Sequence, residues 1–205
     1  WRDSQQAAGK QVVSIAGDAG IDWAADAART ETAMRLGAEV IYQGVFADAQ
    51  WRGIADFLIR IDKPSALGPW SYEAYDTKLA RQPKPYFVLQ LCFYTEQLER
   101  GQGVAPEGMV VVLGTGERDR LMYRDFDSYY RSVRRRFVAA AHVDRATYPY
   151  PVGHCSMCDH GHACERQRHE DDHLSEVAGI RRDQVQRLNE AGIRTVAELS
   201  AIDPT

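Results

Sequence analysis

The sequence predicts an α/β protein in which helices flank a mixed β-sheet. Three consecutive runs are rich in β-branched and aromatic residues, as strands are, and short polar or Pro- and Gly-containing turns separate them. A helical segment and further strands follow along the same chain, and this order favours one sheet covered by helices. The expected strands are residues 39–46, 51–61, 70–79, 109–113 and a short one near 120–123.

Three helices are expected around these strands. The first is rich in Ala and stops at Gly37, the second follows Pro83 and Pro85, and the third has Asp125 or Asp127 as its N-cap. Because the first three strands follow one another through short connections, we expect a mostly antiparallel meander. The expected helices are residues 23–37, 86–100 and 126–142.

The chain is expected to have three parts. The Pro-rich stretch 148–151 is typical of a boundary. Before it lies a core of residues 1–150, and after it a Cys-rich segment, 151–172, and a small helical hairpin domain, 173–205. The chain starts without Met and ends inside a patterned region, so we expect it to belong to a longer protein.

The composition is that of an ordinary folded domain. The 205 residues are 44% hydrophobic and 26% charged. No apolar run reaches the roughly 18–20 residues that span a bilayer, and the polar N-terminus lacks a secretory signal, so we expect a cytoplasmic protein without a membrane partner. The net charge of −4 gives no global signal for nucleic acid. Local charge placement would have to provide DNA binding.

Two carboxylates and a lysine form the sharpest motif. Asp56 interrupts an apolar strand, and Asp76 and Lys78 end the next strand twenty positions later. Alternate residues of a strand share a face, so Asp76 and Lys78 point the same way. If the two strands pair, Asp56 joins them on one patch of the sheet.

Such a patch suits the hydrolysis of a phosphodiester. Carboxylate oxygens hold Mg²⁺ or Mn²⁺ and leave positions for phosphate and water. The metal polarises the phosphoryl oxygen and activates its bound water, and a nearby lysine stabilises negative charge. The alternative is a surface ion pair at a strand edge. Carboxylates within apolar strands are costly to bury unless they bind something, which favours the site.

A third motif, Gln90-x-x-x-Tyr94, places both side chains on one face of the expected helix 86–100. That face could bind a phosphate or stack on a base. In this order, Gly-x-x-Asp, Asp-x-Lys and Gln-x-x-x-Tyr resemble the RecB-like branch of the PD-(D/E)XK nucleases, over about residues 30–172. The resemblance implies catalytic roles for Asp56, Asp76, Lys78, Gln90 and Tyr94.

The resemblance also implies the fold and the partners. It implies a restriction-endonuclease-like fold, Mg²⁺-dependent cleavage of DNA, and a linked or partner helicase in a DNA repair or defence protein. A non-catalytic scaffold, kept for DNA binding and stabilised by a metal cluster, is the alternative. The family carries an acidic residue on a helix before the first strand, and we expect that helix to be mostly missing here, with residues 1–10 as its remnant. The acidic candidates upstream are Asp18, Asp22, Asp26 and Glu31.

Three of the four cysteines, Cys155, Cys158 and Cys164, are crowded together. In a chain without a secretion signal this crowding points to metal ligation. Cys-x-x-Cys suits Zn²⁺ or an iron–sulfur cluster equally. The fourth cysteine, Cys92, is most simply a small buried residue. Candidates for a fourth zinc ligand are His154, His160 and His162.

The same family includes nucleases with a [4Fe–4S] cluster. Their ligands resemble this pattern, with three cysteines after the Gln-x-x-x-Tyr helix and one far upstream. The resemblance therefore implies a [4Fe–4S] cluster on the three clustered cysteines, with Zn²⁺ as the alternative. No upstream cysteine occurs in residues 1–91.

The C-terminal part repeats Ala-Gly-Ile, at 178–180 and 191–193, each time before an expected helix start. This pattern resembles a helix-hairpin-helix unit, in which a Gly-bearing turn and a helix N-terminus present N–H groups to a phosphate. A small protein-interaction module is the alternative. The expected DNA contacts are Gly179, Arg181, Gly192 and Arg194, beside Arg182. A run of four arginines on the preceding helix either contacts the DNA backbone or forms a solvated face, and the sequence favours neither. These residues are Arg131, Arg134, Arg135 and Arg136.

Overall fold

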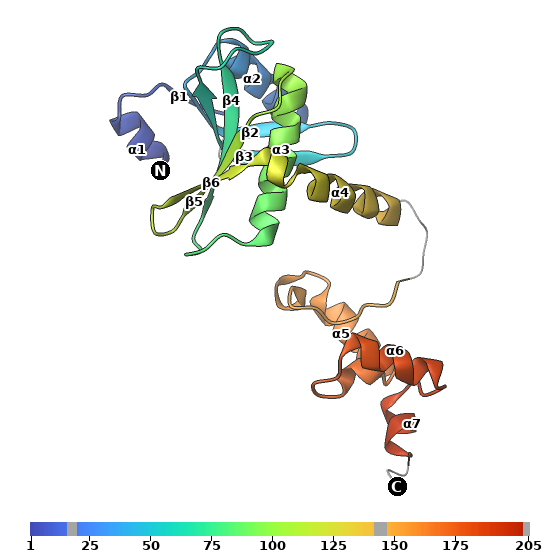
Figure 1. Ribbon diagram of the computed structural model, residues 1–205. Coiled ribbons are helices and arrows are strands. Elements are labelled where there is room, and N and C mark those ends of the chain that lie inside the picture. The colour runs from blue at the N-terminus through green and yellow to red at the C-terminus, as the bar shows by residue number, and fades with distance from the viewer. Residues whose placement is uncertain (16–19, 142–146, 203–205) are drawn as a thin grey trace. The chain divides into compact units, whose positions relative to one another are not determined.

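The computed structural model describes residues 1–15, 20–141 and 147–202 (Figure 1). The chain forms two compact units, Trp1–His142 and Val143–Thr205. Among the described residues, no helix combines the length and the apolar character that a membrane crossing requires.

The first unit is built on one six-stranded sheet, which confirms the expected α/β class. All five expected strands are present, with ends shifted by a few residues. The additional strand at one edge has three residues, too few for its pattern to stand out in the sequence. In spatial order the strands are β1 (Val12–Ser14), β2 (Val40–Ala47), β3 (Arg52–Ile61), β4 (Ser71–Lys78), β5 (Gly108–Leu113) and β6 (Arg118–Met122).

The sheet is more mixed than a mostly antiparallel meander. Strands β2, β3 and β4 are antiparallel neighbours, as expected, and β5 and β6 also pair antiparallel. However, β4 and β5 run parallel, because α3 carries the chain back before β5 begins. The short β1 is also parallel to β2. The prediction of a mostly antiparallel sheet was therefore wrong for β4 and β5. These neighbouring strands are connected by a helix, and such a crossover allows a parallel pair.

The helices start at recognisable signals. The Asp22 side chain accepts a hydrogen bond from the Ala25 N–H, and α3 begins at Pro85, where a missing N–H costs nothing. Asp127, expected as a possible cap, lies inside the first turn of its helix and pairs with Arg131. The helices are α1 (Arg2–Ala7), α2 (Trp23–Arg35), α3 (Pro85–Gln102) and α4 (Asp127–Ala141), with a 3-10 turn, η1 (Tyr123–Asp125).

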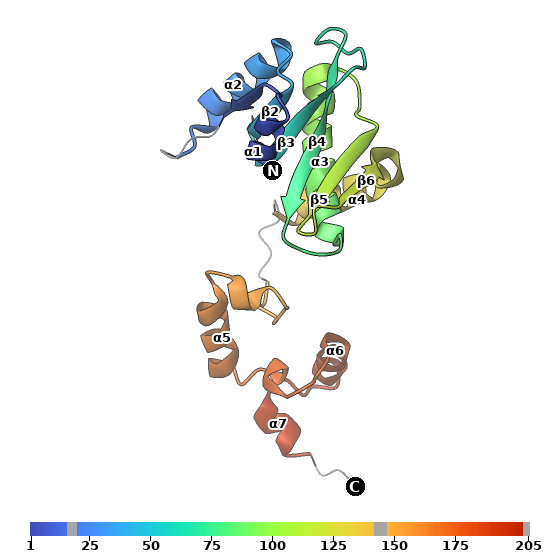
Figure 2. The same cartoon turned by 90° about the vertical axis from the view of Figure 1, so that its left-hand side faces the viewer.

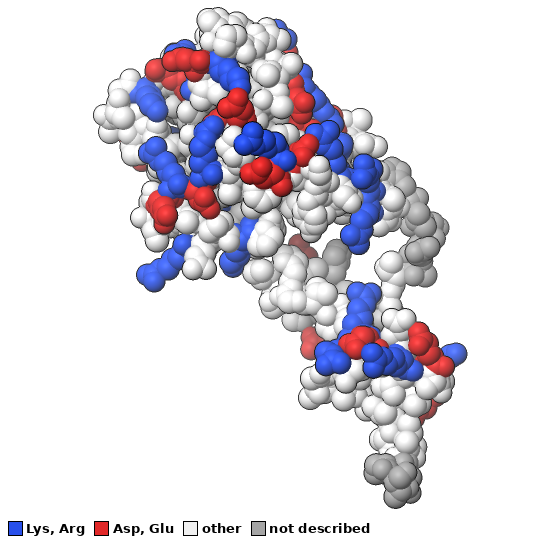
Figure 3. All heavy atoms as spheres, in the orientation of Figure 1, with Lys and Arg blue, Asp and Glu red and all other residues white. Residues whose placement is uncertain are grey.

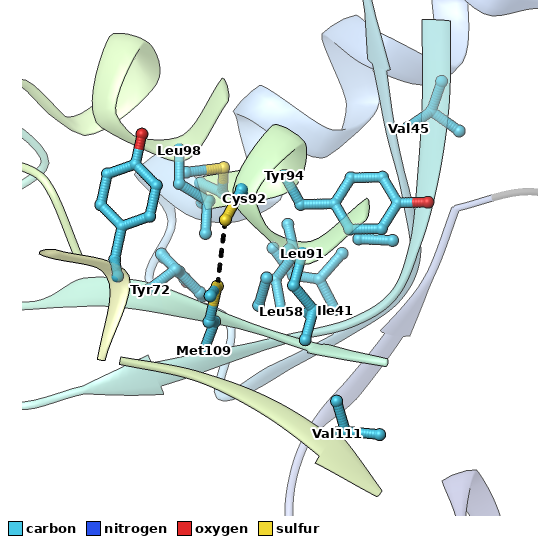
Figure 4. Packing of buried hydrophobic residues seen from close by; sticks show 14 of the residues in the cluster. Ile41, Val45, Leu58, Tyr72, Leu91, Cys92, Tyr94, Leu98, Met109 and Val111 are labelled. Carbon is cyan, nitrogen blue, oxygen red and sulfur yellow. Dashed lines mark hydrogen bonds between the residues drawn. The ribbon is translucent and has the colours of Figure 1, made fainter. Parts of the chain in front are cut away.

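The core lies between the sheet and helices α2 and α3. Figures 1 and 2 show α3 lying along the sheet, and buried side chains of both helices and of β2 to β5 form one cluster. In Figure 4, Leu91, Cys92 and Leu98 point from α3 toward sheet residues such as Met109. Cys92 is fully buried, with its Sγ 3.9 Å from the Met109 Sδ, as expected of a small core residue.

The opposite face of the sheet carries a smaller aromatic cluster. Phe57 packs there with Val40 and Ile59. Trp1, which immediately precedes α1, covers Phe57 edge-on at 4.5 Å between ring centroids and stacks on Tyr75 at 5.8 Å. The N-terminal segment is thereby held against the sheet.

The second unit is small and helical. Pro149 accepts a hydrogen bond from Arg168 through its carbonyl, and the Tyr148 ring stacks on His173, so the Pro-rich stretch belongs to this unit. Leu174 and Val185 form its buried centre. Its elements are η2 (Cys155–Met157), α5 (Gly161–Glu170), η3 (Leu174–Glu176), α6 (Arg182–Glu190) and α7 (Val196–Ser200).

Candidate active site

Strands β3 and β4 part at Asp56. Their ladder runs from the Ile61–Ser71 pair to the Phe57–Tyr75 pair. Beyond it, Asp56 Oδ2 accepts hydrogen bonds from the Thr77 N–H, at 2.7 Å, and from the Thr77 hydroxyl, at 2.5 Å. A carboxylate thus takes the place of a backbone acceptor where the strands separate.

After this point each strand keeps its other neighbour. On one side, β4 continues beside β5, with Asp76 opposite Val111 and Lys78 opposite Leu113. On the other side, β3 continues beside β2. The two carboxylates therefore belong to neighbouring strands at the position where those strands diverge.

The backbone of β2 is distorted beside Asp56. The pairs Tyr42–Phe57 and Gly44–Ala55 flank the positions of Gln43 and Asp56. Gln43 has φ of 52°, in the left-handed region that a residue with a side chain rarely adopts. Strained backbone of this kind gathers at functional sites, and no sequence pattern marks Gln43.

A chain of polar contacts joins the lysine to the helix motif. Lys78 Nζ lies 2.6 Å from Asp76 Oδ2 and donates to Gln90 Oε1 at 2.9 Å. The Gln90 amide donates to the Tyr94 hydroxyl at 2.9 Å, and that hydroxyl donates to the Ile54 carbonyl at 2.6 Å. The structure thus brings together the five residues for which the three motifs imply catalytic roles, because side chains of α3 contact both β3 and β4.

Burial makes the Asp76 carboxylate unusual. Its side chain is 1% exposed, and burial raises its pKa to about 6. The ion pair with Lys78 opposes that rise of the pKa, whereas the neighbouring Asp56 carboxylate adds to it. The Asp56 carboxylate repels the charged form of Asp76. A bound cation or a proton would therefore stabilise this pair of carboxylates.

A pocket of about 580 Å³ opens onto this place, so a solute can reach Asp56 and Lys78. Helix α1 contributes Asp3 to the wall of the pocket, which sequence reasoning did not single out. The remaining lining residues are Trp1, Arg2, Tyr42, Phe57, Thr77, Leu79, Val112, Leu113, Gly114 and Gly116.

The upstream acidic candidates serve α2 instead. Asp22 caps the helix, and Asp26 accepts from the Asp22 N–H at 3.2 Å. Glu31 pairs with Arg35 one turn later at 2.7 Å. The fourth candidate, Asp18, lies outside the described residues.

The donor set at Asp56 and Asp76 fits a hard divalent cation. Mg²⁺ is commonly held by one or two carboxylates, with water and phosphate oxygens completing its coordination. Burial and the neighbouring Asp56 carboxylate both raise the pKa of Asp76, and such an ion would favour the charged form against both. In the part of the chain that the structure describes, no group of three or more His, Cys, Asp or Glu side chains is arranged to hold a metal.

The same finding applies to the cysteines of the second unit. Cys155 lies in η2, Cys158 follows it, and Cys164 lies in α5. All three are half-buried free thiols, and Cys155 Sγ accepts a hydrogen bond from the Val152 N–H at 3.3 Å. We expected the three sulfurs to face a common centre, and the described residues do not form such a group. The [4Fe–4S] cluster and its Zn²⁺ alternative stay predictions.

The helical hairpin has the turns that the sequence predicted. Gly179 and Gly192 adopt φ of 73° and 87°, which glycine tolerates best, ahead of α6 and α7. However, the N–H groups of Arg194 and Thr195 donate to the Glu198 carboxylate. A phosphate at this turn would have to displace that carboxylate.

Both expected arginine contacts lie beside these turns. The Arg181 side chain pairs with Asp183 at 3.0 Å, immediately before and within α6. Arg194 is exposed and follows Gly192 by two positions. The four expected DNA contacts therefore lie in the two turns that precede α6 and α7.

Known proteins do not extend this description. No model of a protein family matches the chain, and no curated protein matches it either.

Proposed function

We propose that the first unit is a metal-dependent DNA nuclease of the RecB-like PD-(D/E)XK type, with the restriction-endonuclease-like fold. The observation that carries this proposal is the polar network Asp76–Lys78–Gln90–Tyr94 beside Asp56. A surface ion pair would need neither the burial of Asp76 nor the helix side chains that hold Lys78. The pocket beside the diverging strands gives a substrate access to Asp56 and Lys78.

The residues take distinct roles in the proposed reaction. Asp56 and Asp76 hold Mg²⁺ or Mn²⁺, which when bound polarises a phosphoryl oxygen and lowers the pKa of its water. Lys78 donates to a phosphate oxygen and offsets the negative charge that develops there. Gln90 orients Lys78 through its carbonyl oxygen. Tyr94 ties Gln90 and α3 to the backbone of β3 at Ile54.

The second unit extends the proposal to DNA binding. Gly179, Arg181, Gly192 and Arg194 are proposed to contact the phosphate backbone, and the cysteines to hold a [4Fe–4S] cluster or, alternatively, Zn²⁺. A helicase, linked or separate, is the proposed partner, in a cytoplasmic repair or defence protein. In Figure 3, Lys and Arg side chains on the first unit are interspersed with Asp and Glu. DNA binding would therefore rest on local groups of charges.

One observation favours the alternative, a non-catalytic DNA-binding scaffold. Within residues 1–15 and 20–141, no third acidic or histidine side chain joins Asp56 and Asp76 in a metal-holding group. The scaffold would bind DNA but leave it intact. Cleavage and binding must therefore be measured side by side.

The test compares the chain with two matched variants on strand β4. Fluorescently labelled single- and double-stranded DNA is incubated with Mg²⁺, Mn²⁺ or chelator. We expect metal-dependent cleavage, about 100-fold or more slower in Asp76→Asn. Glu73→Gln is the control, since Glu73 is equally buried but pairs with Arg120 and lies away from the site. If the wild-type chain binds DNA and leaves it intact, the result favours the scaffold. If the chain neither binds nor cleaves DNA, both proposals are refuted.

A further inference from the structure

An aromatic pocket adjoins the candidate site. It has a volume of about 380 Å³, within the rough range of 300–1,000 Å³ for small-ligand sites. The start of β3 forms one side of it, and helices α3 and α4 form the others. The residues that line it are Trp51, Arg52, Gly53, Leu89, Gln90, Phe93, Tyr94, Tyr130, Val133, Arg134 and Phe137.

Three rings from three elements converge at this pocket. Trp51 lies 6.1 Å from Phe93 and 5.7 Å from Phe137, between ring centroids, at interplanar angles of 44° and 43°. Phe137 remains 60% exposed, so part of its ring is free to contact another molecule. The missing side chain of Gly53 makes room, because a Cβ there would lie 2.5 Å from the Phe93 ring.

Positive charge accompanies the rings. The Arg134 guanidinium, which also pairs with Glu96 at 3.1 Å, lies 5.3 Å from the centre of the Trp51 ring. Arg52 is exposed at the start of β3, and Arg135 and Arg136 are exposed on α4 with no ion pair in the described part of the chain. Aromatic faces beside guanidinium groups are the chemistry that holds bases and phosphates of single-stranded nucleic acids.

The pocket shares two residues with the polar network of the proposed active site. Gln90 and Tyr94 line the pocket and also belong to the network that holds Lys78. A DNA strand with a phosphate at Lys78 would therefore have Gln90 beside it, and Gln90 is also a wall of the pocket. An apolar segment of a protein could also pack against the three rings. Such a segment would not explain why the pocket shares Gln90 and Tyr94 with the network of the proposed active site.

We propose that this pocket stacks one unpaired base of the DNA strand next to the phosphate that is cleaved. A base inside a duplex is already stacked on both faces and cannot enter without being extruded. The site would therefore prefer single-stranded DNA. This inference rests on the proposed nuclease function and adds the form of its substrate.

The first experiment measures binding without cleavage. All proteins carry Asp76→Asn, and a labelled single-stranded oligonucleotide is titrated in Mg²⁺. Removing a stacking ring with Phe137→Ala should weaken binding about 5- to 100-fold. Trp51→Phe, which keeps a ring, should bind nearly normally. The matched control is Tyr129→Ala, since Tyr129 is a 64% exposed aromatic residue of the same helix that does not line the pocket, and it should change little.

The second experiment removes the base instead of the ring. Oligonucleotides carrying one abasic position are scanned along the strand. At the position that enters the pocket, the abasic change and Phe137→Ala should not have additive effects on the binding free energy, because either one abolishes the same stacking contact. Duplex DNA of the same sequence should bind equally to both proteins.

The outcomes separate the two proposals. The stacking pocket would be overturned if Phe137→Ala weakened binding equally to single-stranded, abasic and duplex DNA, or if it did not weaken binding at all. If the wild-type chain still cleaves DNA, the nuclease proposal survives that result. A chain that neither binds nor cleaves DNA would end both. Because Phe137 is mostly exposed, its substitution tests the pocket even if changes at Trp51 disturb folding.

Discussion

Replacing Asp76 with Asn should stabilise the fold at neutral pH while it removes the proposed metal site. Asn has the shape of the protonated acid, so it imitates the state that the folded protein prefers. The preference is clear because burial and the Asp56 carboxylate raise the pKa of Asp76 from 3.8 to about 6. Residues kept for function often cost stability in this way.

The expected size follows from that pKa. A difference of about 2 pKa units, at about 1.4 kcal/mol each, makes ionised Asp76 cost roughly 3 kcal/mol of folding free energy. The attraction of Lys78 is already contained in the value. Because the folded pKa is raised, the contribution of Asp76 to the stability of the wild-type protein is fully present below pH 3.8 and is lost as the pH rises through about 6. The gain in unfolding free energy of Asp76→Asn over wild type should therefore be only about 0.5 kcal/mol at pH 4 and about 1–3 kcal/mol at pH 8.

Urea unfolding at several pH values measures this difference directly. Other titrating groups are common to both proteins and cancel in the comparison. Millimolar Mg²⁺ should narrow the gap at pH 8 by stabilising only the wild-type protein. Glu73→Gln on the same strand should instead destabilise by about 1–3 kcal/mol, because it weakens the bonds of Glu73 to Arg120 and to the Gly108 N–H. Asp76 would be a structural residue if Asp76→Asn were less stable than wild type at pH 8, or if its gain in stability were equal at pH 4 and pH 8.

Three further substitutions test neighbouring parts of the structure. Gly53→Ala should lower the free energy of unfolding by about 1–3 kcal/mol in urea titrations, because its Cβ would lie 2.5 Å from the Phe93 ring; unchanged stability would contradict this packing. Tyr94→Phe should lose about 1 kcal/mol through the missing hydrogen bond to Ile54, and its DNA cleavage should fall with it, whereas full activity would remove Tyr94 from the site. Gly192→Ala should lower the melting temperature of the full chain, because φ of 87° suits only glycine well; a rise in that temperature would speak against the turn.

Local patterns were enough to predict much of the site. Alternation along β4 places Asp76 and Lys78 on one face, and a spacing of four places Gln90 beside Tyr94 on α3. These relations depend on the backbone within one element. The antiparallel pairing of β3 with β4, which brings Asp56 to them, also follows from a short connection between successive strands.

The cysteine segment shows the limit of such patterns. Spacing indicates that Cys155, Cys158 and Cys164 can reach one centre, but it does not say where each sulfur points. In the structure the sulfurs belong to a 3-10 turn, a connecting residue and a helix, and they do not form a metal-holding group.

The sequence by itself determined which segments become strands and helices and which side chains share a face, because those properties depend on neighbours a few positions away. Only the tertiary structure decided that β1 lies parallel to β2, that Asp3 reaches the pocket of Asp56, and that Phe137 meets Trp51. Each of these contacts joins segments far apart in the chain. Their formation depends on the free energy of packing whole elements against one another, which no local periodicity records.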